Sequence, residues 1–111
     1  MLPQEHRLSR ENFKEVLTRG RSTAGAHFSF KYQKLRIGEK PRFSVVISKK
    51  VVKTAVGRHL IKRRVYSFLS SALKTKLSLS GIFFARTGVD RLSFKDLTVE
   101  LEGLLSVARH R

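Results

Sequence analysis

The sequence predicts an α+β fold in which helices pack on a single sheet. Two observations carry this prediction. Residues 27–37 and 42–48 have the patterns of strands, whereas residues 54–77 have apolar side chains at helical spacing. The chain has 111 residues, of which 41% are hydrophobic, and this suffices for one modest core but not for two. We therefore expect residues 1–111 to form one domain, a sandwich of helices and sheet.

A short helix is predicted first. Ser9 can cap its N-terminus, and Asn12 is a weak substitute for the acid of a capping box. Gly20 suits its end. The apolar stripe of this helix, at positions i, i+3 and i+4, consists of Phe13, Val16 and Leu17.

Two strands follow. From His27 to Ile37, aromatic residues alternate with polar ones, so this strand has one buried face. Gly38–Pro41 is typical of a turn, and Arg42–Ser48 predicts a second, more buried strand. We expect these two strands to form a hairpin. The sequence also leaves room for one extra short strand near Arg21–Gly25.

A long helix, a strand and a last helix complete the chain. Residues 54–77 form the longest helical pattern, with Thr54 as its N-cap. Residues 82–85 predict a short central strand, and Ser93 or Asp96 can open the last helix. The stripes that would pack on the sheet are Ile61, Val65, Phe68, Leu69 and Ala72, then Leu97, Leu101, Leu104 and Leu105. The predicted order is α-β-β-(β)-α-β-α.

Charge is the dominant property of the sequence. Lys and Arg number 24 against 8 Asp and Glu, which gives a net charge of +16. Such self-repulsion is tolerated most easily when a polyanion matches it, so the candidate partners are nucleic acid, an anionic membrane surface or an acidic protein. Residues 1–64 hold 17 of the basic side chains. The positive charge is therefore concentrated in the first part of the chain.

The segment Lys49–Arg64 has seven basic residues and no acid. On a helix that turns ~100° per residue, its cations lie away from the apolar stripe. An ordinary solvated face is the alternative, but like charges four residues apart, such as Arg58 and Lys62, destabilise a helix. Arg side chains and a helix N-terminus both suit phosphate groups. The predicted RNA-binding residues are Lys49, Lys50, Lys53, Arg58, His59, Lys62, Arg63, Arg64 and Tyr66.

The sequence argues against catalysis by the chain itself. It has no Cys, and its four His are scattered without metal-ligand spacing. No Ser has a partner base at a recognisable spacing, and the seven Gly are isolated. Asp96 and Glu100 share a helix face and could hold a metal, although such pairs are more often solvated. No stretch approaches the ~18 apolar residues of a membrane span, so we expect a cytoplasmic protein.

The order of residues around the long helix resembles that of the bacterial ribonuclease P protein component. In that family a strand ending in SKK is followed by AVxRNxxKR, the RNR motif. Here SKK at 48–50 is followed by AVGRHLIKR at 55–63. Arg7-Leu8, Phe13 and Gly20 also resemble the opening of the family, so the resemblance covers nearly the whole chain.

This resemblance implies an α+β sandwich with a left-handed βαβ crossover, a rare exception to right-handed connections. It also implies a function as the protein subunit of ribonuclease P, which removes the 5′ leader from precursor tRNA. Catalysis would belong to the RNA subunit and its Mg²⁺ ions, while the protein aids binding of substrate and metal. The implied partners are ribonuclease P RNA and precursor tRNA, with no obligate protein partner.

The resemblance also assigns roles to residues of the long helix. Arg58, Lys62 and Arg63 match the RNR motif, whose helix faces the catalytic RNA in the family. His59 stands where the family usually has Asn, and it can still donate one hydrogen bond. Tyr66 stands where another Arg is common. It could stack on a base or donate its hydroxyl.

A cleft between the first helix and the sheet is implied to receive the 5′ leader. Phe13 matches an aromatic residue that lines this cleft. Leu17 and Lys31 occupy positions where relatives have aromatic residues, so stacking is expected to be weaker here and phosphate attraction stronger. The strand pattern leaves open whether Phe30 and Tyr32 face the cleft or the core, and helix packing favours the core.

Two alternatives remain. A ribosomal or other structural RNA-binding protein fits the composition equally well, but it gives no reason for the order of the SKK and AVxR motifs. A stand-alone nuclease would need a carboxylate metal site, for which Asp96 and Glu100 are the candidates.

Overall fold

The computed structural model describes residues 2–110 and has helices on both faces of a four-stranded sheet. The elements in chain order are η1 (Gln4–His6), α1 (Arg10–Arg19), β1 (Arg21–Ala24), β2 (Phe28–Lys34), β3 (Phe43–Val46), α2 (Ala55–Ala72), β4 (Leu79–Ala85), η2 (Val89–Arg91) and α3 (Phe94–Arg109). The predicted fold class and element order are confirmed, and the extra short strand is β1. No helix of the described residues is long and apolar enough to cross a membrane.

The strand order is β1-β2-β4-β3, so the predicted hairpin between β2 and β3 is wrong. β4 lies between them, antiparallel to β2 and parallel to β3. The reason is burial: Ile82 and Phe83 point to opposite faces of β4 and are both fully buried, which suits a central strand. The hairpin is formed instead by β1 and β2, where the N–H of Gly25 donates to the carbonyl of Phe28 at 2.7 Å.

The chain crosses from β3 through α2 to the neighbouring parallel strand β4. This is the βαβ crossover that the family resemblance implies. Its left-handed sense stays a prediction.

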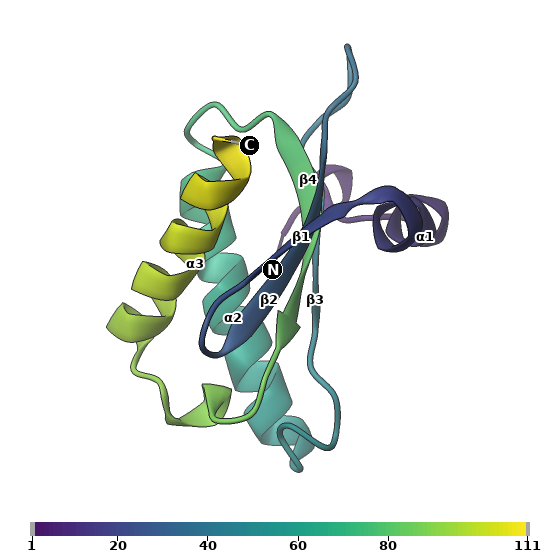
Figure 1. Cartoon of the computed structure of the whole chain (residues 1–111). Coiled ribbons are helices and arrows are strands. Elements are labelled where there is room, and N and C mark those ends of the chain that lie inside the picture. The colour runs from purple at the N-terminus through teal and green to yellow at the C-terminus, as the bar shows by residue number, and fades with distance from the viewer. Residues whose placement is uncertain (1, 111) are drawn as a thin grey trace.

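The sheet separates two layers of helices. Figure 1 shows α2 and α3 on one face and α1 on the other. The main core lies on the α2–α3 side, where the rings of Phe30 and Phe83 stack with centroids 4.1 Å apart. Phe30 and Tyr32 both belong to this core, as helix packing predicts. Because side chains alternate along a strand, Ser29, Lys31 and Gln33 face α1.

The predicted helix caps are confirmed. The hydroxyl oxygens of Ser9, Thr54 and Ser93 accept from the N–H groups of Asn12, Gly57 and Asp96, at 3.2, 3.0 and 3.1 Å. Ser93, and not Asp96, therefore opens α3. Helix α2 ends at Ala72, earlier than the predicted 77, because Leu77 turns into the core ahead of β4.

Helix α1 ends at Gly20 as predicted, but the reason differs from the expected one. Gly20 has an extended backbone, with φ −69° and ψ 155°, so no left-handed turn requires glycine here. A Cβ atom at this position would clash with the carbonyl oxygen of Val16 in α1 and would lie 2.9 Å from that of Tyr32 in β2. Glycine is needed because the backbone passes closely between the end of α1 and β2.

Candidate RNA-binding interface

Three lysines lie on the loop between β3 and α2. Lys49, Lys50 and Lys53 are exposed, whereas Ile47 and Val52 on the same loop are buried. The carbonyl of Ser48 accepts from the N–H groups of Val51 and Val52, both at 3.1 Å, which closes a turn with Lys49 and Lys50 at its tip. Two apolar anchors and a closed turn thus present the lysines to solvent beside the N-terminus of α2.

Arg58 fixes this loop to the helix. Its Nη1 donates to the carbonyls of Val52 and Lys53 at 2.9 and 3.1 Å. Its guanidinium is therefore partly engaged within the protein. Arg58 therefore holds the backbone of the loop in place at Val52 and Lys53.

The outward face of α2 mixes cations with apolar side chains. His59 and Arg63 are exposed, and Lys62 is half-buried beside them. Val56 and Leu60 lie between these cations and are 81% and 44% exposed. The sequence reasoning missed both, although they stand four residues apart and outside the core stripe. Cations match phosphates, and exposed apolar groups can pack on sugars or bases.

Tyr66 stands two turns after His59 on the same side of α2, but it is not exposed. It is half-buried and packs against the main core. Burial raises the pKa of Tyr66, while Arg7 and the backbone of Val45 act in the opposite direction. The side chain therefore points toward β3 and the N-terminal segment.

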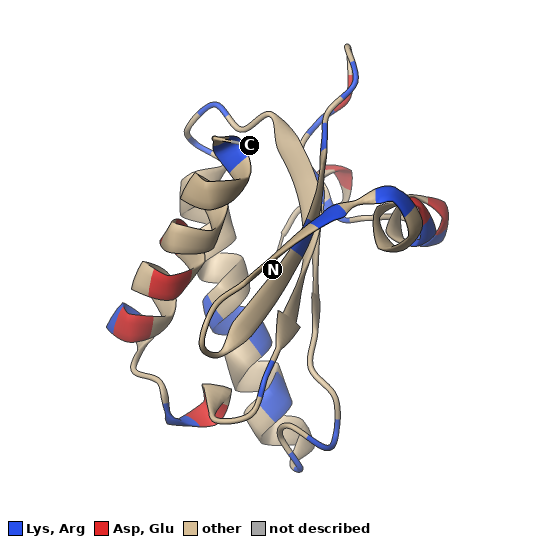
Figure 2. Cartoon of the chain, viewed as in Figure 1, with Lys and Arg blue, Asp and Glu red and all other residues tan. Residues whose placement is uncertain are grey.

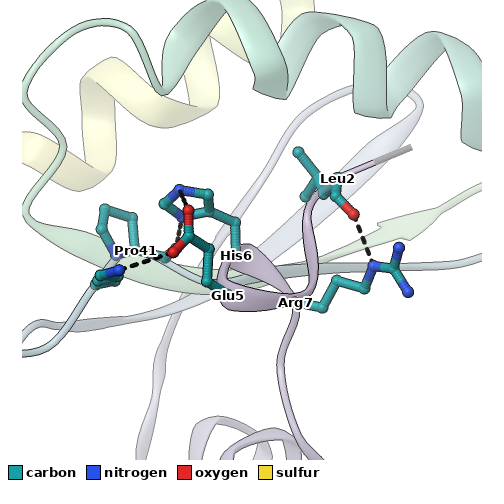
Figure 3. A network of polar contacts seen from close by, with 6 residues as sticks. Leu2, Glu5, His6, Arg7 and Pro41 are labelled. Atoms are coloured by element: carbon teal, nitrogen blue, oxygen red, sulfur yellow. Dashed lines mark hydrogen bonds and ion pairs between the residues drawn. The ribbon is translucent and has the colours of Figure 1, made fainter.

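The N-terminal segment holds Arg7 near Tyr66. Figure 3 shows the Nε of Arg7 donating to the carbonyl of Leu2, at 2.7 Å, and Leu2 is fully buried. In the same network, the Nδ1 of His6 lies 2.7 Å from the carbonyl oxygen of Pro41. Arg7 thus adds a cation to the β3 side of α2. The sequence reasoning did not assign it to the RNA-binding set.

The same network includes an ion pair at the surface. Lys40 donates to Glu5 at 2.7 Å, and this hydrogen bond holds the pKa of Glu5 below its usual value. The pair is exposed, so it fixes the segment only weakly. The buried Leu2 side chain is the stronger anchor.

Arg64 lies on the other flank of α2. Its Nη1 donates to the carbonyl of Leu92 at 3.4 Å, toward the connection between η2 and α3.

The predicted RNA-binding residues thus form a central group, with Tyr66 on one flank and Arg64 on the other. The central group, which we call the α2 basic surface, consists of Lys49, Lys50, Lys53, Arg58, His59, Lys62 and Arg63. Figure 2 shows this concentration of basic residues along the first half of α2 and the loop before it.

The face of the sheet toward α1 carries the candidate leader cleft. Phe13 and Lys31 are half-buried, and Leu17 is 37% exposed. Helix α1 contacts both β2 and β4 from this side. Phe13 and Leu17 thus lie on α1, and Lys31 lies on the face of the sheet that α1 covers.

Strand register adds two residues to this region. Phe84 is paired with Ser29 and with Val46, so Phe84 and Val46 share the face of Lys31. Both are half-buried. The sequence reasoning assigned neither Phe84 nor Val46 to the cleft. Side chains alternate along β4, so a core position for Phe83 places Phe84 on the opposite face, toward α1.

The carboxylates do not assemble a metal site. Among residues 2–110, no group of three His, Asp or Glu side chains could hold an ion. Glu100 accepts from the backbone N–H of His27 at 2.8 Å, and its other oxygen lies 3.0 Å from the Nδ1 of that ring. With both oxygens of Glu100 engaged, Asp96 and Glu100 do not present two available carboxylates.

Comparisons with known proteins agree with this geometry. The model of the family Ribonuclease P matches residues 2–109. The chain is 32% identical to the ribonuclease P protein component of Microcystis aeruginosa, over 94% of this chain and 91% of that one. It is 31% identical to the component of a Pseudanabaena species, over 98% and 96%.

Solved structures show the same fold. The RNase P protein of Staphylococcus aureus superposes with a TM-score of 0.83, at 23% identity, over 93% of this chain and 94% of that one. The RNase P protein of Thermotoga maritima superposes with a TM-score of 0.77, at 21% identity, over 89% and 94%.

Proposed function

The chain belongs to the ribonuclease P protein family, and from this premise we propose that it helps a catalytic RNA subunit to remove the 5′ leader of precursor tRNA. The observation that carries the proposal is the α2 basic surface. It gathers the SKK loop and the first turns of α2 at one end of the molecule, without an acidic residue among its members. We propose that this surface binds the phosphates of the RNA subunit.

The region between α1 and the sheet is the proposed site for the leader. Phe13 and Phe84 offer aromatic rings to unpaired bases, and Lys31 offers a charge to their phosphates. Val46 ends β3 on this face, only three residues before Lys49. A single strand lying along the sheet would therefore run toward the SKK loop. In this proposal the leader would lie close to the RNA subunit, at the same end of the molecule.

Magnesium is proposed to act from the RNA subunit. Mg²⁺ held by the RNA would supply the nucleophilic hydroxide for hydrolysis. The cations of the chain would neutralise nearby phosphates, so that less magnesium is needed to hold substrate and RNA together. The proposed compartment is the cytoplasm.

Cleavage of a 5′-labelled precursor tRNA by the RNA subunit at low magnesium tests the proposal. We expect the purified chain to raise the rate of leader removal by at least tenfold. A structural RNA-binding protein would bind the RNA and leave the rate unchanged, which would contradict the proposal. Cleavage by the chain without any RNA subunit would instead support a stand-alone nuclease.

A further inference from the structure

A hollow of about 250 Å³ lies at the end of the sheet where β2 finishes. Its lining residues are Arg19, Arg21, Tyr32, Gln33 and Lys34. Lys34 is paired with Leu79, directly after the connection that leaves the C-terminus of α2. The α2 basic surface lies at the other end of this helix. Helix α2 has 18 residues and, at ~1.5 Å per residue, is about 27 Å long.

The fold sets the cations around the tyrosine. Arg21 is directly opposite Tyr32 in the β1–β2 register, so the two side chains share one face. Lys34 stands two residues beyond Tyr32 and shares that face too. Arg19 reaches the hollow from the end of α1, because Gly20 lets the chain pass directly against Tyr32.

The charge of this hollow is not balanced within the protein. None of the salt bridges found among residues 2–110 includes Arg19, Arg21 or Lys34. Glu15, one turn before Arg19, is bonded to Arg36 at 2.6 Å instead. Three neighbouring cations without a carboxylate favour an anionic ligand.

The tyrosine supplies a second and independent observation. Tyr32 is only 2% exposed, and its ring stacks on Phe30 with centroids 5.4 Å apart. Its hydroxyl is buried and has no hydrogen-bond partner among the described residues. A buried hydroxyl left unpaired lowers stability, so such a group usually has a partner. The hydroxyl has almost no accessible surface, so a phosphate oxygen would accept its proton only once the side chains around the hollow move aside.

We propose that Arg19, Arg21 and Lys34, with the Tyr32 hydroxyl, form a second phosphate-binding site. The ligand is a backbone phosphate of RNA, in a segment other than the one on the α2 basic surface. This choice of ligand rests on the proposed function. The phosphate could come from the catalytic RNA or from precursor tRNA, and the experiment below separates the two.

The test is equilibrium binding of the full chain to each RNA separately, at about 50 to 200 mM salt. The variants are Arg21→Ala, Lys34→Ala and Tyr32→Phe, with Lys95→Ala on α3 as a control that also removes one exposed cation. We expect each of the first three to weaken binding to one RNA about fivefold, and the two charge variants to lower the salt slope by about 0.7–0.9. The RNA that is affected identifies the source of the phosphate.

Stability of the free chain separates a ligand role from a structural one. Tyr32→Phe removes an unpaired hydroxyl and keeps the ring, so its unfolding midpoint should equal or exceed that of the wild type. Arg21 and Lys34 are exposed, so their removal should not impair folding. The proposal is overturned if any of the three variants binds both RNAs as the wild type does, or if Lys95→Ala weakens binding equally. A wrong proposed function would be detected in a different experiment, the cleavage assay, in which the wild-type chain would not stimulate leader removal.

Discussion

Arg58 and Arg63 stand five residues apart on α2, on different sides of the helix. Arg58 is half-buried and holds two carbonyls of the SKK loop, whereas Arg63 projects from the exposed face. Both match the RNR motif, and no property of the sequence separates them. Only the structure shows that Arg58 supports the loop while Arg63 is exposed to solvent.

Arg63→Ala should weaken binding of the chain to the catalytic RNA without changing its stability. The variant loses one exposed cation, so affinity should fall about fivefold, and the slope of log affinity against log salt by about 0.7–0.9. Filter binding over a range of salt concentrations measures both, with Lys95→Ala as the matched control. Unchanged affinity and slope would show that Arg63 does not face the RNA.

Arg58→Ala should lower the stability of the protein as well as its RNA affinity. The guanidinium makes two hydrogen bonds to loop carbonyls, and their loss should cost about 1–2 kcal/mol in the free energy of unfolding. Urea unfolding checks this, and Arg63→Ala serves as the control that should unfold like the wild type. Equal stability of all three proteins would refute the positioning role of Arg58.

Tyr66 should make the protein sensitive to alkali. Burial raises the pKa of Tyr66 above its ordinary value near 10, so the folded state keeps the proton that the unfolded state loses. The stabilisation is complete below the ordinary value and is lost as pH rises through the raised pKa. Tyr66→Phe should therefore lose less stability than the wild type as pH rises above 10 and through the raised pKa. Identical pH profiles in urea unfolding would contradict the effect of burial on Tyr66.

Local features of the elements were predictable from sequence. Each predicted N-cap is made by a hydroxyl and an N–H three residues on, which depends only on short-range order. The pairing of strands was not predictable in the same way. A two-residue period shows which face of a strand is buried but not which strand lies beside it. The position of β4 between β2 and β3 therefore could not be predicted from this pattern.

The candidate site was predicted only in part, for the same reason. The cations of one helix and its preceding loop are close in sequence, so their grouping could be foreseen. Arg7, Phe84 and Val46 reach the interface or the cleft through long-range packing of the N-terminal segment and the sheet. No local pattern reports such contacts.

The layer formed by α1 and the sheet should respond to the leader of the substrate. Phe13→Ala removes an aromatic ring of the proposed cleft, and the loss of base stacking should weaken binding by about 1–3 kcal/mol. Affinity for precursor tRNA should therefore fall more than affinity for leaderless tRNA, in complexes with the RNA subunit. Equal losses for both substrates would place Phe13 in a purely structural role.

At the scale of the whole molecule, charge is sorted between the elements. Figure 2 shows basic residues on the first half of α2 and the loop before it, and acidic residues on the first half of α3 and on η2. An uneven distribution of this kind orients a protein as it approaches a polyanion. The α2 basic surface should therefore meet RNA first, with the acidic part of α3 turned away.

The absence of Cys makes this orientation directly measurable, since one introduced thiol can be labelled alone. Val56→Cys places a label on the exposed face of α2, and Val99→Cys places one on α3, where Val99 is 62% exposed. Iron-EDTA attached at each position cleaves nearby RNA through hydroxyl radicals. We predict strong, localised cleavage of the catalytic RNA from position 56 and little from position 99. Equal cleavage from both positions, or stronger cleavage from position 99, would contradict the assignment of the α2 basic surface to the RNA subunit.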